Sequence, residues 1–231
     1  DSSPPQAICS GLQVSLSAGG IGFVNAGSVG PNSYDNCGPV TLTLSRDDSL
    51  YTPLLQVTCA DIGLLPIILK VTDAVGLENF CQTEVEVRDL LKPNIQCPPN
   101  VTLTCLQSHE NLQLTGQATA TDNCALQSLD FNDINLIGSC NIGSVTRLWT
   151  AADAGGNTKS CVQQIALTAV STVQVVFPPD VTVNACADTS DVLPPATGQP
   201  VTSGQHCFPL SVTYTDEILQ NSAASPFCYR I

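Results

Sequence analysis

The sequence repeats itself at the spacing of a small domain. An Asp-Asn-Cys tripeptide at residues 35–37 returns at residues 122–124. A turn motif that begins at Asp73 returns at Asp153, and a cysteine follows each of these aspartates eight residues later. A Pro-Pro-x-Val-Thr segment at residues 98–102 returns at residues 178–182. Units of about 80–88 residues are too long for solenoid repeats and are typical of small domains.

These repeats divide the chain into three predicted domains. The first repeat spans residues 1–91, the second repeat residues 92–172 and the third repeat residues 173–231. In the second repeat, Cys140 is followed by Trp149, the Asp153 turn and a final apolar stretch. The equivalent Cys228 of the third repeat is followed by only three residues. We therefore expect the third repeat to lack roughly its last third.

Apolar residues alternate with polar ones, which is the period of β-strands and not of helices. The alternating segments are residues 12–16, 40–44, 84–88, 101–104 and 210–214. Gly, Pro, Asn and Asp separate them at short intervals, and the segments at residues 73–76 and 153–156 fit type I turns, with Asp first and Gly fourth. The sequence therefore predicts an all-β chain of tandem immunoglobulin-like antiparallel β-sandwiches, in which Trp149 is a core residue.

Twelve cysteines are spread along the chain, which indicates an oxidising compartment. A zinc site would need close pairs such as Cys-x-x-Cys, but the nearest neighbours, Cys97 and Cys105, are eight residues apart. We therefore expect disulfides that staple the sandwiches and an extracellular location, either secreted or on the cell surface. Because the chain has no methionine and does not begin with a signal peptide, we expect it to be a processed product or a segment of something longer.

The charge balance excludes one class of partner. Seven basic residues stand against 20 acidic ones, and the formal net charge is −13. A nucleic-acid-binding protein needs a basic surface, so this function is excluded. The apolar runs are short and interrupted, so no segment is expected to insert into a membrane.

The motifs together resemble a known family. The opening Ile-x-Cys-Pro-Pro-x-Val-Thr at residues 95–102, the Asp-Asn-Cys centre and the ending from Trp149 to Cys161 are similar to the hyalin repeat, an immunoglobulin-like module. The closest resemblance is to its Cys-rich form in large secreted proteins of Bacteroidetes-type bacteria. The resemblance implies adhesion or stalk-like spacing outside the cell, often after type IX secretion, and no enzyme activity. Leu77 departs from the turn motif, and Phe177 replaces the opening cysteine of the third repeat.

The positions of the cysteines within the repeats suggest a bonding scheme. Two bridges, Cys9–Cys81 and Cys97–Cys161, would join the first and last strands of a sandwich. Three shorter ones would pin central loops: Cys37–Cys59, Cys124–Cys140 and Cys207–Cys228. Cys105 and Cys186 are then left over. We expect each to be unpaired or bonded to another domain or chain, and Cys186 to find its partner in the missing part of the third repeat.

No catalytic residues are predicted, because neither His109 nor His206 lies in a recognised nucleophile motif. Calcium is the cofactor that the sequence would best suit, since calcium binds clustered carboxylate and amide oxygens. Candidate ligands are Asp35-Asn36, Asp47-Asp48, Asp61 and Asp122-Asn123. We favour the alternative that these side chains stabilise turns through local hydrogen bonds, so the sequence predicts no cofactor and no metal site.

Two functional hypotheses follow. The first is a non-enzymatic structural segment that serves as a stalk, filament or appendage and contacts other copies of itself or the rest of a longer chain. An incomplete third sandwich would leave open strand edges, which strands of another copy could fill. The second is an adhesin module whose loops at the ends of the sandwiches bind a cell-surface glycan or protein. Aromatic residues make up only 5% of the chain, which favours the structural role.

Overall fold

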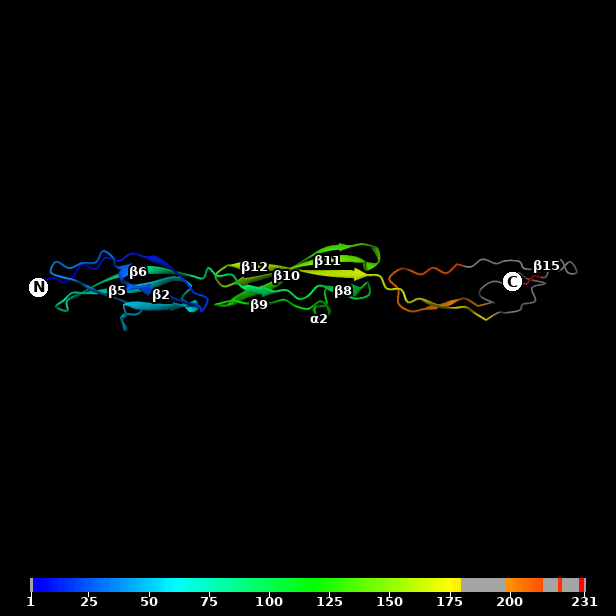
Figure 1. Cartoon of the computed structure of the whole chain (residues 1–231), viewed down its shortest axis with the longest axis horizontal. Helices are drawn as coiled ribbons and strands as arrows, with labels where there is room; N and C mark the ends of the chain where they lie inside the picture. Colours follow the sequence, from blue (N-terminus) through cyan, green and yellow to red (C-terminus); the bar gives the residue numbers. More distant parts are fainter. Residues whose placement is uncertain (1, 180–197, 214–219, 222–228, 231) are drawn as a thin grey trace. The chain divides into compact units, whose positions relative to one another are not determined.

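The computed structural model describes residues 2–179, 198–213, 220–221 and 229–230. Strands account for most of its regular structure (Figure 1). Each of the two α-helices among the described residues has four residues. None of the described helices is long and apolar enough to cross a membrane. The expected all-β fold is therefore confirmed.

In the first repeat the strands form two sheets. A four-stranded sheet has the order β1-β6-β5-β3, and a two-stranded sheet pairs β2 with β4. The elements are β1 (Leu12–Ser15), β2 (Ile21–Asn25), α1 (Ala26–Val29), β3 (Thr41–Ser45), β4 (Leu54–Thr58), the 3-10 turn η1 (Cys59–Asp61), β5 (Gly63–Thr72) and β6 (Glu78–Arg88). The pairs are antiparallel except β1 with β6, which run parallel with Leu12 opposite Val85.

The second repeat has a similar pattern. A four-stranded sheet has the order β10-β11-β12-β8, a two-stranded sheet pairs β7 with β9, and β8 again runs parallel to the last strand, β12. The elements are β7 (Asn94–Gln96), β8 (Val101–Thr104), α2 (Leu112–Thr115), β9 (Thr119–Thr121), β10 (Leu126–Ile137), the 3-10 turn η2 (Ser139–Asn141), β11 (Gly143–Asp153) and β12 (Thr158–Thr168). The parallel pairs differ from the antiparallel expectation, because alternation along a strand does not encode its direction.

Beyond the second repeat the described strands are short. β13 (Gln174–Val176) pairs with β14 (Val201–Ser203), and β15 (Gln220–Asn221) pairs with β16 (Tyr229–Arg230). The strand expected at residues 210–214 is wrong over its described part, since residues 210–213 belong to no strand. The third-repeat segment at 180–197, including Cys186, lies outside the described residues, as does Cys228.

The chain separates into two compact units. The first contains the described residues up to 99 together with 116–134 and 146–163, and the second contains 100–115, 135–145 and the described residues from 164 onward. The first unit has a core drawn from both sheets of the first repeat, with Val24 and Val57 from the smaller sheet and Leu44, Leu69 and Val85 from the larger one. Two sheets that bury their facing side chains in one core form a β-sandwich.

The second unit has a smaller core. Its fully buried members are Leu103, Val145, Ile165 and Leu167. These residues come from β8, β11 and β12, which are neighbours in one sheet. In β12 the buried positions alternate with more exposed ones, as expected for a strand that has one face in the core.

Two hairpin turns have the predicted form. Gly76 donates a backbone hydrogen bond to Asp73 (3.3 Å), and Gly156 donates the same bond to Asp153 (3.3 Å). Both glycines have a positive φ, 92° and 86°, which residues with a Cβ adopt at a cost. The turns connect β5 to β6 and β11 to β12, so the expectation from the sequence is confirmed.

Trp149 is buried, as the sequence predicts. Its side chain is 1% exposed, and its ring lies 4.8 Å from the ring of Phe131 between centroids. The Arg147 guanidinium stacks on Phe131 at 4.0 Å and pairs with Asp133 at 2.8 Å. The tryptophan is therefore a core residue.

Candidate functional site

Two long-range disulfides have the expected partners. Cys9 bonds to Cys81 across 72 residues, and Cys97 bonds to Cys161 across 64 residues. Each joins a segment near the start of a repeat to its last long strand, β6 or β12. Such disulfides form and persist in oxidising environments, so they indicate an extracellular or secreted protein.

The expected bridges Cys37–Cys59 and Cys124–Cys140 are wrong. Cys59, which begins η1 of the first repeat, bonds instead to Cys124 in the Asp-Asn-Cys motif of the second, with the two Cα atoms 5.3 Å apart. The prediction assumed that bridges stay within a repeat, whereas a bond depends on closeness in space. Cys37 is an exposed free thiol and Cys140 is a half-buried one.

A second bridge also crosses the predicted repeat boundaries. Cys105, expected to be left over, bonds to Cys207, so the pairing of Cys207 with Cys228 is wrong as well. Both cysteines belong to the second compact unit. The side chain of Asn141, the residue after the free Cys140, donates a hydrogen bond to the carbonyl of Cys105 (2.8 Å).

Several of the candidate calcium ligands are turn residues, as the favoured alternative predicted. Asp35 accepts a hydrogen bond from the Cys37 amide (2.8 Å). Asp47 accepts bonds from the Ser49 hydroxyl (2.6 Å) and amide (3.2 Å), and these bonds lower the pKa of Asp47. Such local bonds stabilise turns and need no metal.

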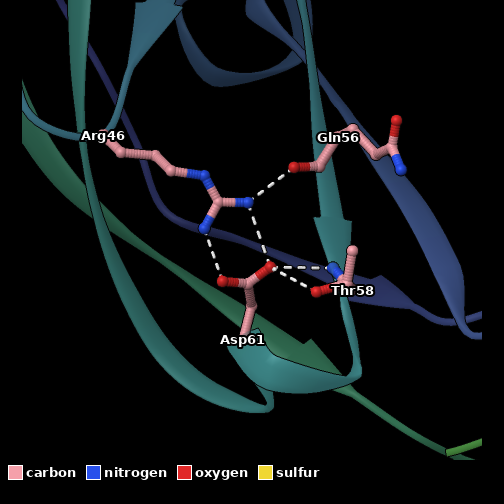
Figure 2. A network of polar contacts seen from close by, with 4 residues as sticks. All are labelled: Arg46, Gln56, Thr58 and Asp61. Carbon is pink, nitrogen blue, oxygen red and sulfur yellow. Dashed lines mark hydrogen bonds and ion pairs between the residues drawn. The ribbon is translucent and has the colours of Figure 1, made fainter. Parts of the chain in front are cut away.

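Asp61 belongs to an ion-pair network (Figure 2). The Arg46 guanidinium donates to both of its carboxylate oxygens, at 3.0 Å for Nη2 to Oδ2, and also to the carbonyl of Gln56 (2.6 Å). The Thr58 amide donates to Asp61 Oδ2 as well (2.7 Å). The Arg46 hydrogen bond, followed by that from the Thr58 amide, holds the pKa of Asp61 below its ordinary value despite partial burial. Asp61 thus closes η1, the turn that carries Cys59.

The structure brings together three other carboxylates that are far apart in the sequence. Asp89, Asp122 and Asp153 each contribute one carboxylate oxygen, and these atoms lie within 4.8 Å of one another. Asp89 directly follows β6, Asp122 follows β9, and Asp153 ends β11. Asp89 is 3% exposed and Asp153 is fully buried, while Asp122 is half-buried.

Two asparagines hold this carboxylate cluster in place. The Asn157 side chain donates to Asp153 Oδ2 and to the carbonyl of Asp89, both at 3.0 Å. The Asn123 side chain donates to Asp89 Oδ1 (3.2 Å) and to the carbonyl of Ser17 (3.4 Å). The turn after Asp153 and the Asp-Asn-Cys motif are therefore connected through Asp89.

Within the described part of the chain, no protein cation balances the charges of the cluster. Among the described residues, no Lys, Arg or His forms an ion pair with Asp89, Asp122 or Asp153. At an effective dielectric constant of about 20, two unit charges 4.8 Å apart repel each other by about 3 kcal/mol. Three ionised carboxylates at this spacing therefore need a compensating positive charge.

Of these three residues, only Asp122, together with Asn123, is among the ligands that the sequence predicts. The sequence predicts a turn at Asp153 and does not single out Asp89. The signal for Asp153 was its repeat partner Asp73, whose turn has the same shape. Asp89 follows the alternating strand without any motif of its own, so pattern alone could not select it.

Comparisons with known proteins give fold resemblance only. No protein-family model matches the sequence, and no curated protein matches it. The chain is similar to the protocadherin GammaB4 extracellular domain (17% identity, 76% of this chain and 35% of that one, TM-score 0.33). It is also similar to mouse cadherin-23 EC22–24, with 13% identity over 76% of this chain and 70% of that one and a TM-score of 0.34. For the N-terminal four Ig domains of Dscam1 isoform 4.44 the identity is 10% over 72% of this chain and 46% of that one, with a TM-score of 0.34. The chain thus spans about a third of the protocadherin chain. The class of protein that the structure defines is a disulfide-stapled, all-β protein with a β-sandwich in its first repeat.

Proposed function

We propose that the chain is a non-enzymatic structural segment of an extracellular surface protein, in which three successive repeats (1–91, 92–172 and 173–231) serve as a stalk, filament or appendage. The observation that carries this proposal is the Cys59–Cys124 disulfide. It adds a second covalent connection between the first and second repeats, beside the peptide chain. A spacer needs such connections, because modules joined by a single linker move relative to one another by default.

The other bridges support the same arrangement. Cys9–Cys81 and Cys97–Cys161 each lie within one proposed repeat, whereas Cys105–Cys207 connects the second repeat to the third. Each pair of successive repeats then has one disulfide of its own. Cys37 occupies the place in the first Asp-Asn-Cys motif that Cys124 occupies in the second, and it is exposed and free. By this correspondence Cys37 would bond a preceding module or another copy.

The proposal also includes the family and the export route of the protein. The repeat motifs favour a place among hyalin-repeat-like surface proteins of Bacteroidetes-type bacteria that are exported by type IX secretion. Assembly by strand exchange at the third repeat is part of the same hypothesis. It depends largely on residues outside those that the structure describes.

The test of the structural role is the flexibility of the oxidised chain in solution. Small-angle scattering of the wild type is compared with that of C59A/C124A, with C9A/C81A as a control that removes a bridge within one repeat. We expect a wider distribution of chain dimensions in C59A/C124A alone. If C59A/C124A and the wild type scatter identically, the bridge does not fix the repeats and the proposal loses its basis.

A second measurement tests the role of Cys37. The mass of the oxidised chain is measured by light scattering in denaturant, with and without reductant, for the wild type, C37A and C140A. We expect reductant-sensitive species above 24.1 kDa in the wild type and C140A but not in C37A. Equal amounts of linked species in C37A and the wild type would contradict the assignment to Cys37.

A further inference from the structure

We propose that Asp89, Asp122 and Asp153 form a calcium site, a function that goes beyond the structural role proposed above. The three residues come from the end of β6, the segment after β9 and the end of β11, and their ligand atoms lie within 4.8 Å of one another. Calcium–oxygen bonds are about 2.3–2.6 Å long, so two oxygens that bind one calcium ion lie up to about 5 Å apart. The spacing of the cluster therefore suits a single calcium ion.

The hydrogen bonding leaves acceptor atoms without a donor. Asp89 Oδ1 accepts bonds from the Leu91 amide and the Asn123 side chain, but its Oδ2 is buried and has no hydrogen-bond partner. Asp122 Oδ2 accepts a bond from the Cys124 amide (3.0 Å), while its Oδ1 is also buried and without a partner. A buried carboxylate oxygen without a partner is costly, and a bound cation would satisfy both atoms at once.

The donor set selects the class of metal. The cluster offers carboxylate oxygens and no thiolate or imidazole, since Cys124 is bonded to Cys59. Oxygen ligands suit hard cations, and calcium accepts an irregular shell of six to eight ligands that water molecules can complete. Magnesium requires near-ideal octahedral geometry at shorter distances and keeps most of its water, so this partly buried site favours calcium.

A surface depression reaches one member of the cluster, Asp89. A surface depression of about 330 Å³ is lined by Asp89, Gly155 and Asn157, together with residues of β6 and the start of β5. Asn157 is the residue that bonds both Asp153 and the Asp89 carbonyl. Calcium and its remaining water ligands can therefore approach from the side of the Asp153 turn.

The proposed repeats differ in this feature, which makes the inference specific. Ala169 follows β12 at the place where Asp89 follows β6, and the Asp-Asn pair before Cys124 is replaced by Gln205-His206 before Cys207. The equivalent positions in the second and third repeats therefore lack two of the three carboxylates. Among the described residues the cluster is the one group with metal-binding geometry, so one calcium per chain is expected.

The experiment is a calcium titration of the full oxidised chain after removal of divalent ions with a chelator. Calorimetry gives stoichiometry and affinity, and unfolding is followed by the fluorescence of Trp149, the only tryptophan. The variants are D89N and D122N, and the matched control is D130N, an exposed aspartate in β10 outside the cluster. We expect one ion to bind the wild type and D130N with a dissociation constant of about 1 mM or tighter. We also expect at least a tenfold loss of affinity in D89N and D122N.

Unfolding in the absence of calcium separates a metal site from a purely structural role. In chelator, D122N should melt at the same temperature as the wild type or higher, because the substitution removes one of the repelling negative charges. About 10 mM calcium should raise the melting temperature of only the wild type and D130N, by several degrees. The proposal is overturned if the wild type shows neither binding nor a thermal shift with calcium, if D89N and D122N bind as tightly as the wild type, or if magnesium binds as tightly as calcium.

Discussion

The disulfide within the second repeat gives a prediction whose magnitude can be worked out. Cys97 and Cys161 close a loop of 64 residues along the chain, and the path through the Cys105–Cys207 bridge is somewhat shorter, at 54 residue steps (105 − 97 and 207 − 161). In the chain-entropy model, a loop of this length stabilises the folded state by about 4 kcal/mol. Both cysteines are only half-buried, so replacement of both by alanine removes little packing. The double variant C97A/C161A should therefore lose about 4 kcal/mol.

This loss is large if the second repeat folds as a domain of its own, as proposed. A repeat of about 80 residues is expected to have a total stability of about 4–12 kcal/mol. The assay is guanidinium unfolding followed by the fluorescence of Trp149, which lies buried in β11 of the same repeat. With a slope of about 2 kcal/mol per molar guanidinium, the midpoint should fall by about 2 M.

The matched control is C9A/C81A, which removes a loop of 72 residues from the first repeat. If the repeats fold as separate domains, the Trp149 transition of this variant stays within about 0.5 kcal/mol of the wild type. A loss below about 1 kcal/mol in C97A/C161A, with an unchanged slope, would refute the reasoning from loop entropy. A large shift of the Trp149 transition in C9A/C81A would refute the proposed domain boundary.

Three further predictions concern other parts of the chain. D61N should remove up to about 1 kcal/mol. The pKa of Asp61 is lowered in the folded state, so this stabilisation is present above about pH 4 and disappears as the pH falls through the lowered pKa. When the free energy of unfolding is measured against pH, D61N should therefore lose less stability in acid than the wild type. L44A removes a fully buried side chain from the core of the first repeat and should cost about 2–5 kcal/mol in calorimetric unfolding. Peptide mapping of the oxidised protein should find Cys207 bonded to Cys105 and a free Cys140, whereas a Cys140–Cys207 peptide as the main species would contradict the structure.

The fold was largely predictable because its determinants are local. The alternation at residues 84–88 correctly gave Val85 and Val87 as buried, and the Asp-x-x-Gly pattern gave both hairpin turns. Strand direction was not predictable, since β1 and β8 would have the same alternation in either orientation. The residues at 210–213 alternate in the same way and yet belong to no strand, so periodicity is not sufficient without a neighbouring strand.

The carboxylate cluster and the bridges between repeats were harder to predict because they depend on contacts between distant segments. Cys59 is nearer in sequence to Cys37 than to Cys124, and only the placement of η1 against the second Asp-Asn-Cys motif decides the pairing. One departure did carry information. Leu77 stands where Asn157 supplies its amide in the second repeat, and Asp73 Oδ2 is accordingly buried without a partner.

The disulfides also decide how the protein would respond to a pulling force. Tension applied at the two ends passes through the shortest covalent path, which runs from Cys9 to Cys81, along the chain to Cys105, and across to Cys207. Only 24 of the 198 residue steps between Cys9 and Cys207 (105 − 81 and 207 − 9) carry that tension. At about 3.6 Å per residue, this segment can lengthen to about 90 Å instead of about 710 Å, so the chain from Cys9 to Cys207 would remain almost inextensible even if its strands separated.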